Sequence, residues 1–167
     1  MGPRVVSSRI VPPPPPGWRC WEDAMREAIG EAGKAGEAGE TPVGAIVLSG
    51  HGDIIGRAGN AVESLCDPTA HAEILALRAA SESVGNYRLE GCILVVTLEP
   101  CLMCAGALAH ARVAGLVYGA EDRRAGAVQS QLDGLELSFH THFPWHMGGI
   151  CATECAGLLR SFFSSRR

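Results

Sequence analysis

The chain has 167 residues and a mass of 17.5 kDa, which is the size of a single domain. Its composition, 47% hydrophobic and 19% charged, is that of a globular protein and excludes a wholly disordered or collagen-like chain. The formal net charge of −4 excludes a protein that is basic throughout, although a local basic patch could still bind nucleic acid.

No apolar run in the sequence approaches the roughly 18 residues of a membrane span, and no apolar signal segment precedes the first prolines. We therefore expect a cytoplasmic protein that makes no membrane contact. Thiols stay reduced in that compartment, so the seven cysteines are expected to be buried or bound to metal rather than paired as disulfides.

The N-terminal end differs in composition from the rest of the chain. Residues 1–17 include five consecutive prolines, Pro12 to Pro16, and are predicted to form a disordered or polyproline arm. The folded domain is expected to span residues 18–167. Its first element is a helix over residues 18–35, because apolar residues there recur at helical spacing, and glycines should weaken this helix toward its end.

Strands and helices then alternate along the chain. The expected elements are, in order, strands at 43–49 and 54–59, a helix from 67 to 83, a strand at 92–97, a helix at 101–111, a strand at 113–118 and a helix at 150–163. Residues 120–149 are rich in loop signals and are assigned no element. The alternation predicts an α/β fold, a three-layer α/β/α domain around a central mixed sheet of about five strands.

Two short segments at expected helix starts contain residues that can bind a metal ion or transfer a proton. The first contains His71 and Glu73, and the second contains Cys101 and Cys104 directly after a buried strand. Two thiolates at positions i and i+3 lie on one helical turn, and a histidine from another helix can complete three ligands. Three ligands leave the fourth tetrahedral position of a zinc ion open to water, as in catalytic sites. Glu73 is then placed to move a proton between the water and a substrate.

Each segment alone has a simpler explanation. A lone Cys-x-x-Cys is typical of a redox pair or half of a zinc ribbon, and a lone His-x-Glu is typical of an ordinary helix start. No second Cys-x-x-Cys is present to complete a ribbon. Together, 30 residues apart and in this order, the two segments match the zinc deaminase signature.

A longer series of motifs resembles the bacterial tRNA-specific adenosine deaminase family, within the zinc-dependent cytidine and deoxycytidylate deaminase superfamily. The matching segments are residues 67–74 (DPTAHAEI), 86–89 (NYRL), 96–107 (VTLEPCLMCAGA), 117–122 (VYGAED) and the last helix with its Phe-Phe pair. The resemblance covers roughly residues 20–167 and implies a cytidine-deaminase-like fold.

The resemblance also implies an activity, a cofactor and a partner. The activity is hydrolytic deamination of the wobble adenosine of a tRNA anticodon stem-loop to inosine, by a homodimer with one zinc ion per subunit. His71, Cys101 and Cys104 fall on the metal ligands of the family, and Glu73 falls on its proton shuttle.

Substrate contacts are implied in the same way. Asn60 falls on the residue that contacts the purine edge, and the backbone N–H of Ala72 falls where the C6 substituent is bound. Asp122 falls near the neighbouring anticodon nucleotide. Arg166 and Arg167 follow the Phe-Phe pair and are expected to bind RNA phosphates. The alternative is that they form a solvated helix end with no RNA contact.

The chain departs from the family pattern in two places. Residues 141–143 read Thr-His-Phe where the family carries Asn-His-Arg, and Ser164 and Ser165 stand where family members tend to be more basic. These changes concern the RNA contacts rather than the deamination chemistry.

Two other functions, and a second metal site, are alternatives that the sequence raises. A deaminase of a free nucleobase or nucleotide, of the guanine or cytosine type, would share every metal residue, so the zinc site alone does not exclude it. A binding protein without activity would lack a ligand or Glu73, and all four residues are present. A second metal site is not favoured, because its candidate residues lack ligand-like spacing; these residues are His140, His142, His146, Cys151 and Cys155.

Overall fold

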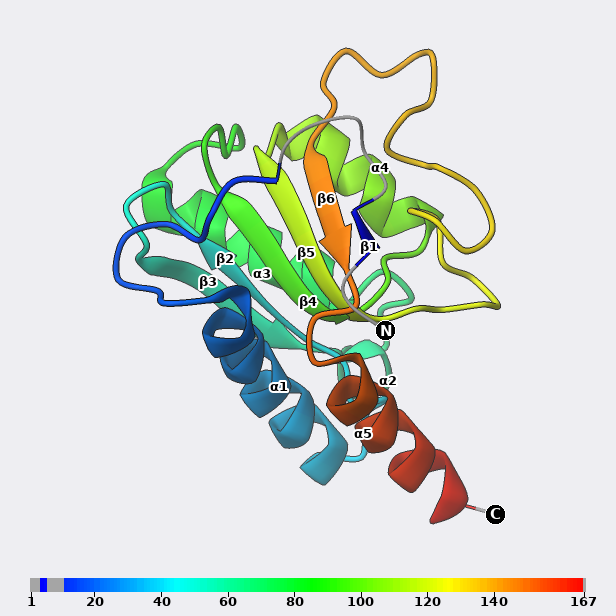
Figure 1. Ribbon diagram of the computed structural model, residues 1–167. Helices are drawn as coiled ribbons and strands as arrows, with labels where there is room; N and C mark the ends of the chain where they lie inside the picture. Colours follow the sequence, from blue (N-terminus) through cyan, green and yellow to red (C-terminus); the bar gives the residue numbers. More distant parts are fainter. Residues whose placement is uncertain (1–3, 6–10, 167) are drawn as a thin grey trace.

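A central sheet of six strands organises the fold (Figure 1). The computed structural model describes residues 4–5 and 11–166. The strands are β1 (Arg4–Val5), β2 (Gly44–Leu48), β3 (Ile54–Gly59), β4 (Ile93–Leu98), β5 (Gly115–Ala120) and β6 (Trp145–Gly148). Their spatial order is β1-β6-β5-β4-β2-β3. Strands β4, β5 and β6 are parallel neighbours, whereas β2 runs antiparallel to both β3 and β4. The sheet is therefore mixed, as the alternation of elements predicts.

Helices cover both faces of this sheet, which confirms the predicted α/β/α layers. The helices are α1 (Trp21–Glu37), α2 (Val62–Leu65), α3 (Ala72–Val84), α4 (Leu102–Ala111) and α5 (Ala152–Ser164). In Figure 1, α1 and α5 lie in front of the sheet, while α3 and α4 lie behind it. Two hydrophobic cores result, one between the sheet and each pair of helices.

Strand β2 illustrates how the sequence fills both cores. Its side chains point alternately to opposite faces of the sheet. Ala45 and Val47 belong to the core beneath α3 and α4. Ile46 and Leu48 belong to the core beneath α1 and α5. All five residues of β2 are buried, which is why the sequence reads as a continuous apolar run rather than an alternating one.

Glycines in the strands let the helices approach closely. A Cβ atom at Gly44 would clash with the backbone of α1 at Ala28. A Cβ atom at Gly56 would clash with the backbone of α3 at Ala76. The helix residues that face these glycines are mostly alanines, so both helices pack against the sheet backbone with little side-chain bulk between them.

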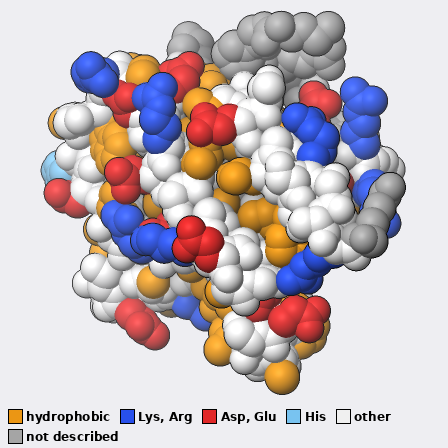
Figure 2. All heavy atoms as spheres, turned by 90° about the horizontal axis from the view of Figure 1, so that it is seen from below, with side chains coloured by type: hydrophobic (Ala, Val, Ile, Leu, Met, Phe, Trp, Pro, Cys, Tyr) orange, Lys and Arg blue, Asp and Glu red, His pale blue; other side chains and the backbone are white. Residues whose placement is uncertain are grey.

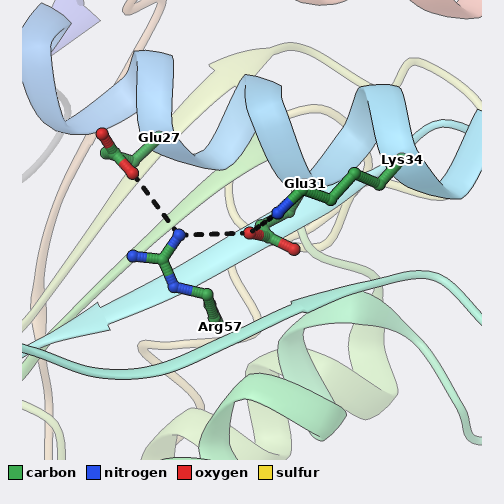
Figure 3. Close-up of polar contacts among 4 residues, drawn as sticks. All are labelled: Glu27, Glu31, Lys34 and Arg57. Atoms are coloured by element: carbon green, nitrogen blue, oxygen red, sulfur yellow. Dashed lines mark hydrogen bonds and ion pairs between the residues drawn. The ribbon is translucent and has the colours of Figure 1, made fainter.

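A polar network connects α1 to the edge strand β3 (Figure 3). The Arg57 guanidinium lies 3.4 Å from a Glu27 carboxylate oxygen and 3.2 Å from a Glu31 oxygen. Lys34 Nζ lies 2.9 Å from the same Glu31 oxygen. Glu31 is buried and therefore benefits from two cationic partners, which together hold α1 against β3.

Some element boundaries differ from the expected ones. The helix expected from residue 67 begins at Ala72, because the Asp67 carboxylate accepts hydrogen bonds from the backbone and hydroxyl of Thr69 and closes a turn instead. Helix α1 continues to Glu37 despite its glycines. The segment at 120–149, to which no element was assigned, contains β6, a short strand that pairs in parallel with β5.

The N-terminal residues that the structure describes lie against the domain. Val11 packs on the core beneath α1, and Pro15 is buried. The indole N–H of Trp18 donates to the backbone carbonyl of Gly52 at 2.8 Å. Residues 1–3 and 6–10 of the expected arm lie outside the described residues, and the division at residue 17 stays a prediction.

None of the helices in the described part of the chain combines the length and the apolar character that a membrane span needs.

Candidate active site

His71 and Cys101 occupy equivalent places at the starts of two helices. Each is the extended residue that precedes a helix, with φ −70° and ψ 151° at His71 and φ −74° and ψ 173° at Cys101. The carbonyl of His71 accepts the first helical hydrogen bond of α3 from Leu75, and that of Cys101 accepts the first of α4 from Ala105. Both side chains therefore lie at the positive end of a helix dipole. At Cys101 this favours the thiolate over the thiol.

The three predicted ligands converge on one point. The Nδ1 atom of His71 lies 3.7 Å from Sγ of Cys101 and 3.6 Å from Sγ of Cys104. Zinc bonded tetrahedrally to nitrogen and sulfur at standard lengths separates such atoms by roughly 3.6 Å. Within residues 4–5 and 11–166 this is the only group of three potential ligands close enough to hold a metal ion. The donor set and its spacing therefore fit zinc with three protein ligands.

The ionisable groups here perturb one another. The pKa of Cys101 is lowered to about 4. The largest cause is a hydrogen bond from the Cys104 thiol, and a hydrogen bond from His71 lowers it further. The hydrogen bond to Cys101, together with burial, raises the pKa of Cys104. Glu73, in the first turn of α3, is only 4% exposed, and burial raises the pKa of its carboxyl to about 7. A carboxyl shielded from bulk water lies directly beside the candidate metal ligands.

A pocket of about 310 Å³ opens over these residues. Its volume is in the range of small-molecule sites. The pocket is lined by Glu40, Thr41, Val43, Asn60, Val62, Glu63, His71, Glu73, Leu98, Glu99, Cys101, Asp122 and Ala125. It thus brings together Asn60, Asp122, His71, Glu73 and Cys101, which are separated by up to 62 positions in sequence.

Asn60 lies directly after β3 and is held by the carboxylate of Glu40. The Asn60 Nδ2 atom donates to Glu40 at 3.1 Å, and its backbone N–H donates to the Val43 carbonyl at 2.9 Å. Glu40 also accepts hydrogen bonds from the backbone N–H groups of Glu63 and Ser64 at the start of α2. The hydrogen bond from Ser64 is the largest of the effects that lower the pKa of Glu40.

Asp122 is placed by a second buried carboxylate, Glu99. Glu99 is 2% exposed and accepts hydrogen bonds from the backbone N–H groups of Asp122, Val128, Gln129 and Ser130 and from the Ser130 hydroxyl. Burial alone would raise the pKa of Glu99, but the hydrogen bonds from Ser130, Gln129 and Asp122 lower it. One carboxylate therefore organises the loop that closes one side of the pocket.

The remaining predicted substrate residues differ in their surroundings. Ala72 is fully buried and is the first residue of α3, so its N–H has no acceptor within the helix. Arg166 lies outside the pocket, with its guanidinium 4.1 Å from the Phe162 ring centre and donating to the Gly39 carbonyl at 2.6 Å. Arg167 lies outside the described residues.

The other histidines and cysteines of the C-terminal third are engaged separately. The side chains of His140 and His142 contact the backbone carbonyls of Gly134 and Val113. Cys155 is buried where α5 packs on β5. No second cluster of potential metal ligands occurs within the described residues.

Sequence reasoning missed Glu40 and Glu99. Neither belongs to a spacing pattern, since each acts through backbone N–H groups that are 20 or more positions away in the chain. For both residues the signal was an acidic residue beside an apolar strand, since Glu99 directly follows β4 and Glu40 comes shortly before β2; Glu99 also lies inside the matching segment 96–107.

The surface near the site carries both signs of charge. Figure 2 views the molecule from below Figure 1, the side on which α2 lies. Lys and Arg side chains are interspersed there with Asp and Glu and with exposed hydrophobic side chains, so no field of a single sign covers this face.

Comparisons with known proteins agree with this geometry. The sequence model of the family described as the cytidine and deoxycytidylate deaminase zinc-binding region matches residues 19–120. The tRNA-specific adenosine deaminase of Haemophilus influenzae is 44% identical over 146 residues, which are 87% of this chain and 84% of that protein.

Solved structures give the same result. A structure from a study of A-to-I editing by tRNA:A34 deaminases has a TM-score of 0.78 and 44% identity, and the match covers 81% of this chain and 97% of that one. The guanine deaminase of Bacillus subtilis has a TM-score of 0.58 and 40% identity, with 60% and 64% covered. The chain is thus a zinc-binding deaminase, and it belongs to the family of tRNA-specific adenosine deaminases within the cytidine and deoxycytidylate deaminases.

Proposed function

We propose that this enzyme hydrolyses adenosine to inosine at the wobble position of a tRNA anticodon. The observation that carries the proposal is the convergence of His71, Cys101, Cys104 and Glu73 beneath one pocket. This arrangement occurs in a chain that shares 44% identity with a tRNA-specific adenosine deaminase across most of both proteins. Guanine deaminases share the fold, but they resemble this chain less: the Bacillus subtilis match covers 60% of the chain with a TM-score of 0.58, and the Nitrosomonas europaea match, which covers 98%, is only 24% identical.

The proposed roles follow from the chemistry of each side chain. His71, Cys101 and Cys104 hold zinc, which supplies Lewis acidity that makes water a nucleophile near neutral pH. Glu73 takes a proton from the attacking water and delivers it to the base. The reaction forms a C6–O bond, breaks the bond between C6 and the exocyclic nitrogen, and releases ammonia. Because Glu73 is almost entirely buried, few water molecules compete with the base for this proton.

Three further groups orient the base. We assign contact with the purine edge to the Asn60 amide, and contact with the C6 substituent to the backbone N–H of Ala72. Asp122 faces the same pocket from the opposite loop and is assigned to the neighbouring nucleotide. The wobble nucleotide must leave the anticodon stack to reach C6 with the attacking water, as in other enzymes that act on a base.

We also propose that the enzyme acts as a homodimer in the cytoplasm. An apolar surface on α3 and α4 supports this assembly. Ile74, Leu77, Ala107 and Ala111 line a hollow of about 590 Å³ on these helices, and the exposed Tyr87 of the loop after α3 borders it. Exposed apolar surface of this kind marks protein interfaces, and a second copy of this chain is the partner implied by the resemblance to the family.

We also propose that residues 1–17 form an arm appended to the deaminase domain.

The proposed function is tested by measuring inosine in a synthetic anticodon stem-loop with adenosine at the wobble position. Free adenosine, guanine and cytidine are assayed in parallel at the same enzyme concentration. Inosine should form in the stem-loop and at no other adenosine of the same RNA. Faster release of ammonia from guanine or cytidine than from the stem-loop would overturn the proposal in favour of a free-base deaminase.

A further inference from the structure

Glu40 is a buried carboxylate beside the pocket, and the proposed reaction gives it no role. It lies in the turn between α1 and β2 and is 3% exposed. Within residues 11–166 no lysine or arginine forms an ion pair with it. A buried charge without a cationic partner must be stabilised by hydrogen bonds. Glu40 receives three of them, at 2.8 Å from the Ser64 N–H, 3.1 Å from Asn60 Nδ2 and 3.3 Å from the Glu63 N–H.

The charge of Glu40 limits how the Asn60 amide can lie. An ionised carboxylate accepts hydrogen bonds and donates none. The Asn60 NH₂ group must therefore face Glu40, and the carbonyl oxygen Oδ1 must face away. A flipped amide would place two acceptor oxygens against each other. One N–H of Asn60 is used in this contact, so the other N–H and Oδ1 remain for a ligand.

Asn60 and Glu40 line the same pocket, together with two of the candidate metal ligands, His71 and Cys101. An asparagine amide distinguishes purines by presenting a donor and an acceptor in a fixed order. That order is lost if the amide can rotate by half a turn. We propose that Glu40 is a positioning residue. Its carboxylate fixes the amide of Asn60 in the orientation that forms hydrogen bonds with the purine edge. The inference rests on the proposed function for the identity of the base, whereas the contact itself is present without substrate.

The alternative is that Glu40 only stabilises the backbone. Its hydrogen bonds with Glu63 and Ser64 hold the first turn of α2, and the adjacent Gly39 carbonyl accepts from Arg166. Glu40→Gln separates the two roles. Glutamine keeps the shape and an acceptor oxygen for the Ser64 N–H, whereas an NH₂ group replaces the oxygen that accepts from both Asn60 and the Glu63 N–H. Any effect that persists in an Asn60→Ala background therefore belongs to the backbone. The glutamine NH₂ group can also donate to Oδ1 of Asn60, so both amide orientations become possible.

The orientation can be measured without any reaction. The chain has only two asparagines, Asn60 and Asn86, so labelling asparagine with ¹⁵N gives two side-chain NH₂ signals by NMR. In the wild type, Asn60 should show one hydrogen-bonded proton that exchanges slowly with water. Glu40→Gln should shift this signal and speed its exchange, while the Asn86 signal stays unchanged. Glu37→Gln, an exposed residue three positions earlier, is the matched control.

The effect on substrate recognition is measured by a double-mutant cycle. Glu40→Gln should raise the KM for the stem-loop roughly three- to tenfold, the effect of one lost hydrogen bond, with a smaller change in kcat. If Glu40 acts through Asn60, then Glu40→Gln should add no further KM increase to Asn60→Ala. If Glu40→Gln does not fold, Glu40→Asp keeps the charge but ends one methylene short of Asn60, and it enters the same cycle.

The results distinguish failure of the inference about Glu40 from failure of the proposed function. An unshifted Asn60 signal in Glu40→Gln overturns the inference, as do KM effects that multiply in the double variant. A wild-type enzyme that forms no inosine in the stem-loop overturns the proposed function instead. The NMR experiment would still decide whether Glu40 orients Asn60.

Discussion

Glu73 combines two properties that proton transfer requires: a carboxyl group beside the candidate metal ligands and exclusion from bulk water. Glu73→Gln keeps the side-chain shape but removes the ability to carry a proton. We expect the variant to bind zinc and to melt near the wild-type temperature. Its deaminase activity should fall at least about 100-fold, the usual contribution of general acid–base catalysis. Inosine formation and zinc content are measured on the same preparation, and activity within tenfold of wild type would contradict the assignment.

The ligand triad predicts one zinc ion per chain. A metal that binds only the native state stabilises it by mass action, so a chelator should lower the melting temperature of the wild type. Cys104→Ala removes one of three ligands from a fully buried position and should abolish stoichiometric zinc. Metal analysis and thermal melting with and without chelator check this. Isolation of a metal-free enzyme with Cys101 and Cys104 joined as a disulfide would refute the prediction.

Some residues of this site could be predicted from the sequence, and others could not. His71, Glu73, Cys101 and Cys104 could be predicted as candidates because their spacing lies within single helical turns, which is a local property, and the fold does bring His71, Cys101 and Cys104 together. Glu40 and Glu99 could not be identified, because most of their partners are backbone N–H groups, and all of the partners are brought close only by folding. Backbone hydrogen bonds leave no mark on residue type, so a carboxylate that binds them cannot be distinguished from a surface acid.

Among the secondary-structure elements, α1 was expected to weaken at its glycines, yet it continues through them to Glu37. Gly33 has nothing within 4 Å of the position of a Cβ atom, so alanine fits there. Gly33→Ala should stabilise the protein by roughly 0.5–1 kcal/mol, because alanine loses less conformational entropy in a helix. Differential scanning calorimetry should show a melting temperature a few degrees higher.

Gly44 is the matched contrast for Gly33. A methyl group at Gly44 would clash with the α1 backbone at Ala28, so Gly44→Ala should destabilise the protein and lower its melting temperature. A Gly33→Ala variant that melts below the wild type would show that α1 does not pack as described.

The loop after β5 depends on a single acceptor group. Glu99→Ala would leave four backbone N–H groups without their shared partner, and each buried one that water does not reach costs about 1–3 kcal/mol. We expect faster amide hydrogen exchange in residues 121–131 and a higher KM, because Asp122 is no longer fixed. Glu121→Ala, an exposed neighbour, is the control. Unchanged exchange in this segment would contradict the role of Glu99.

Element types could be predicted better than element boundaries. The buried strands and amphipathic helices follow from hydrophobic periodicity, which packing on both sides of the sheet preserves. The start of α3 was misplaced because Asp67 and Thr69 form a local turn that competes with the helix. Strand β6 was missed because it has only four residues, three of which pair with β5, and its position is set by that neighbouring strand rather than by its own pattern.

At the scale of the whole molecule, the apolar surface on α3 and α4 predicts dimerisation. Tyr87 is 67% exposed at the border of this surface. Tyr87→Glu would place a charge in the interface and should shift the protein toward monomer, since desolvating an unpaired charge is costly. Sedimentation velocity over a concentration series measures the shift. Phe163→Glu, on α5, is the control. A wild type that sediments as a monomer at all concentrations would contradict the proposed assembly.

The overall charge of −4 requires that RNA binding depend on a few local arginines. Each phosphate contact to a single strand contributes about −0.7 to the slope of log affinity against log salt. Arg167→Ala should therefore raise the KM for the stem-loop more than it lowers kcat and should flatten this slope by about that amount.

Arg166 requires a separate comparison because its guanidinium already donates to the Gly39 carbonyl, next to Glu40. If Arg166 binds phosphate, Arg166→Ala flattens the salt dependence as Arg167→Ala does. If it acts only by holding the turn at Gly39, the KM rises with no change in slope, and its assignment to RNA is wrong. Arg19→Ala is the control, because Arg19 precedes the opposite end of α1 from Gly39 and its side chain is 89% exposed. A helix of 17 residues is about 25 Å long, so Arg19 lies about that far from the turn at Gly39 that Arg166 contacts.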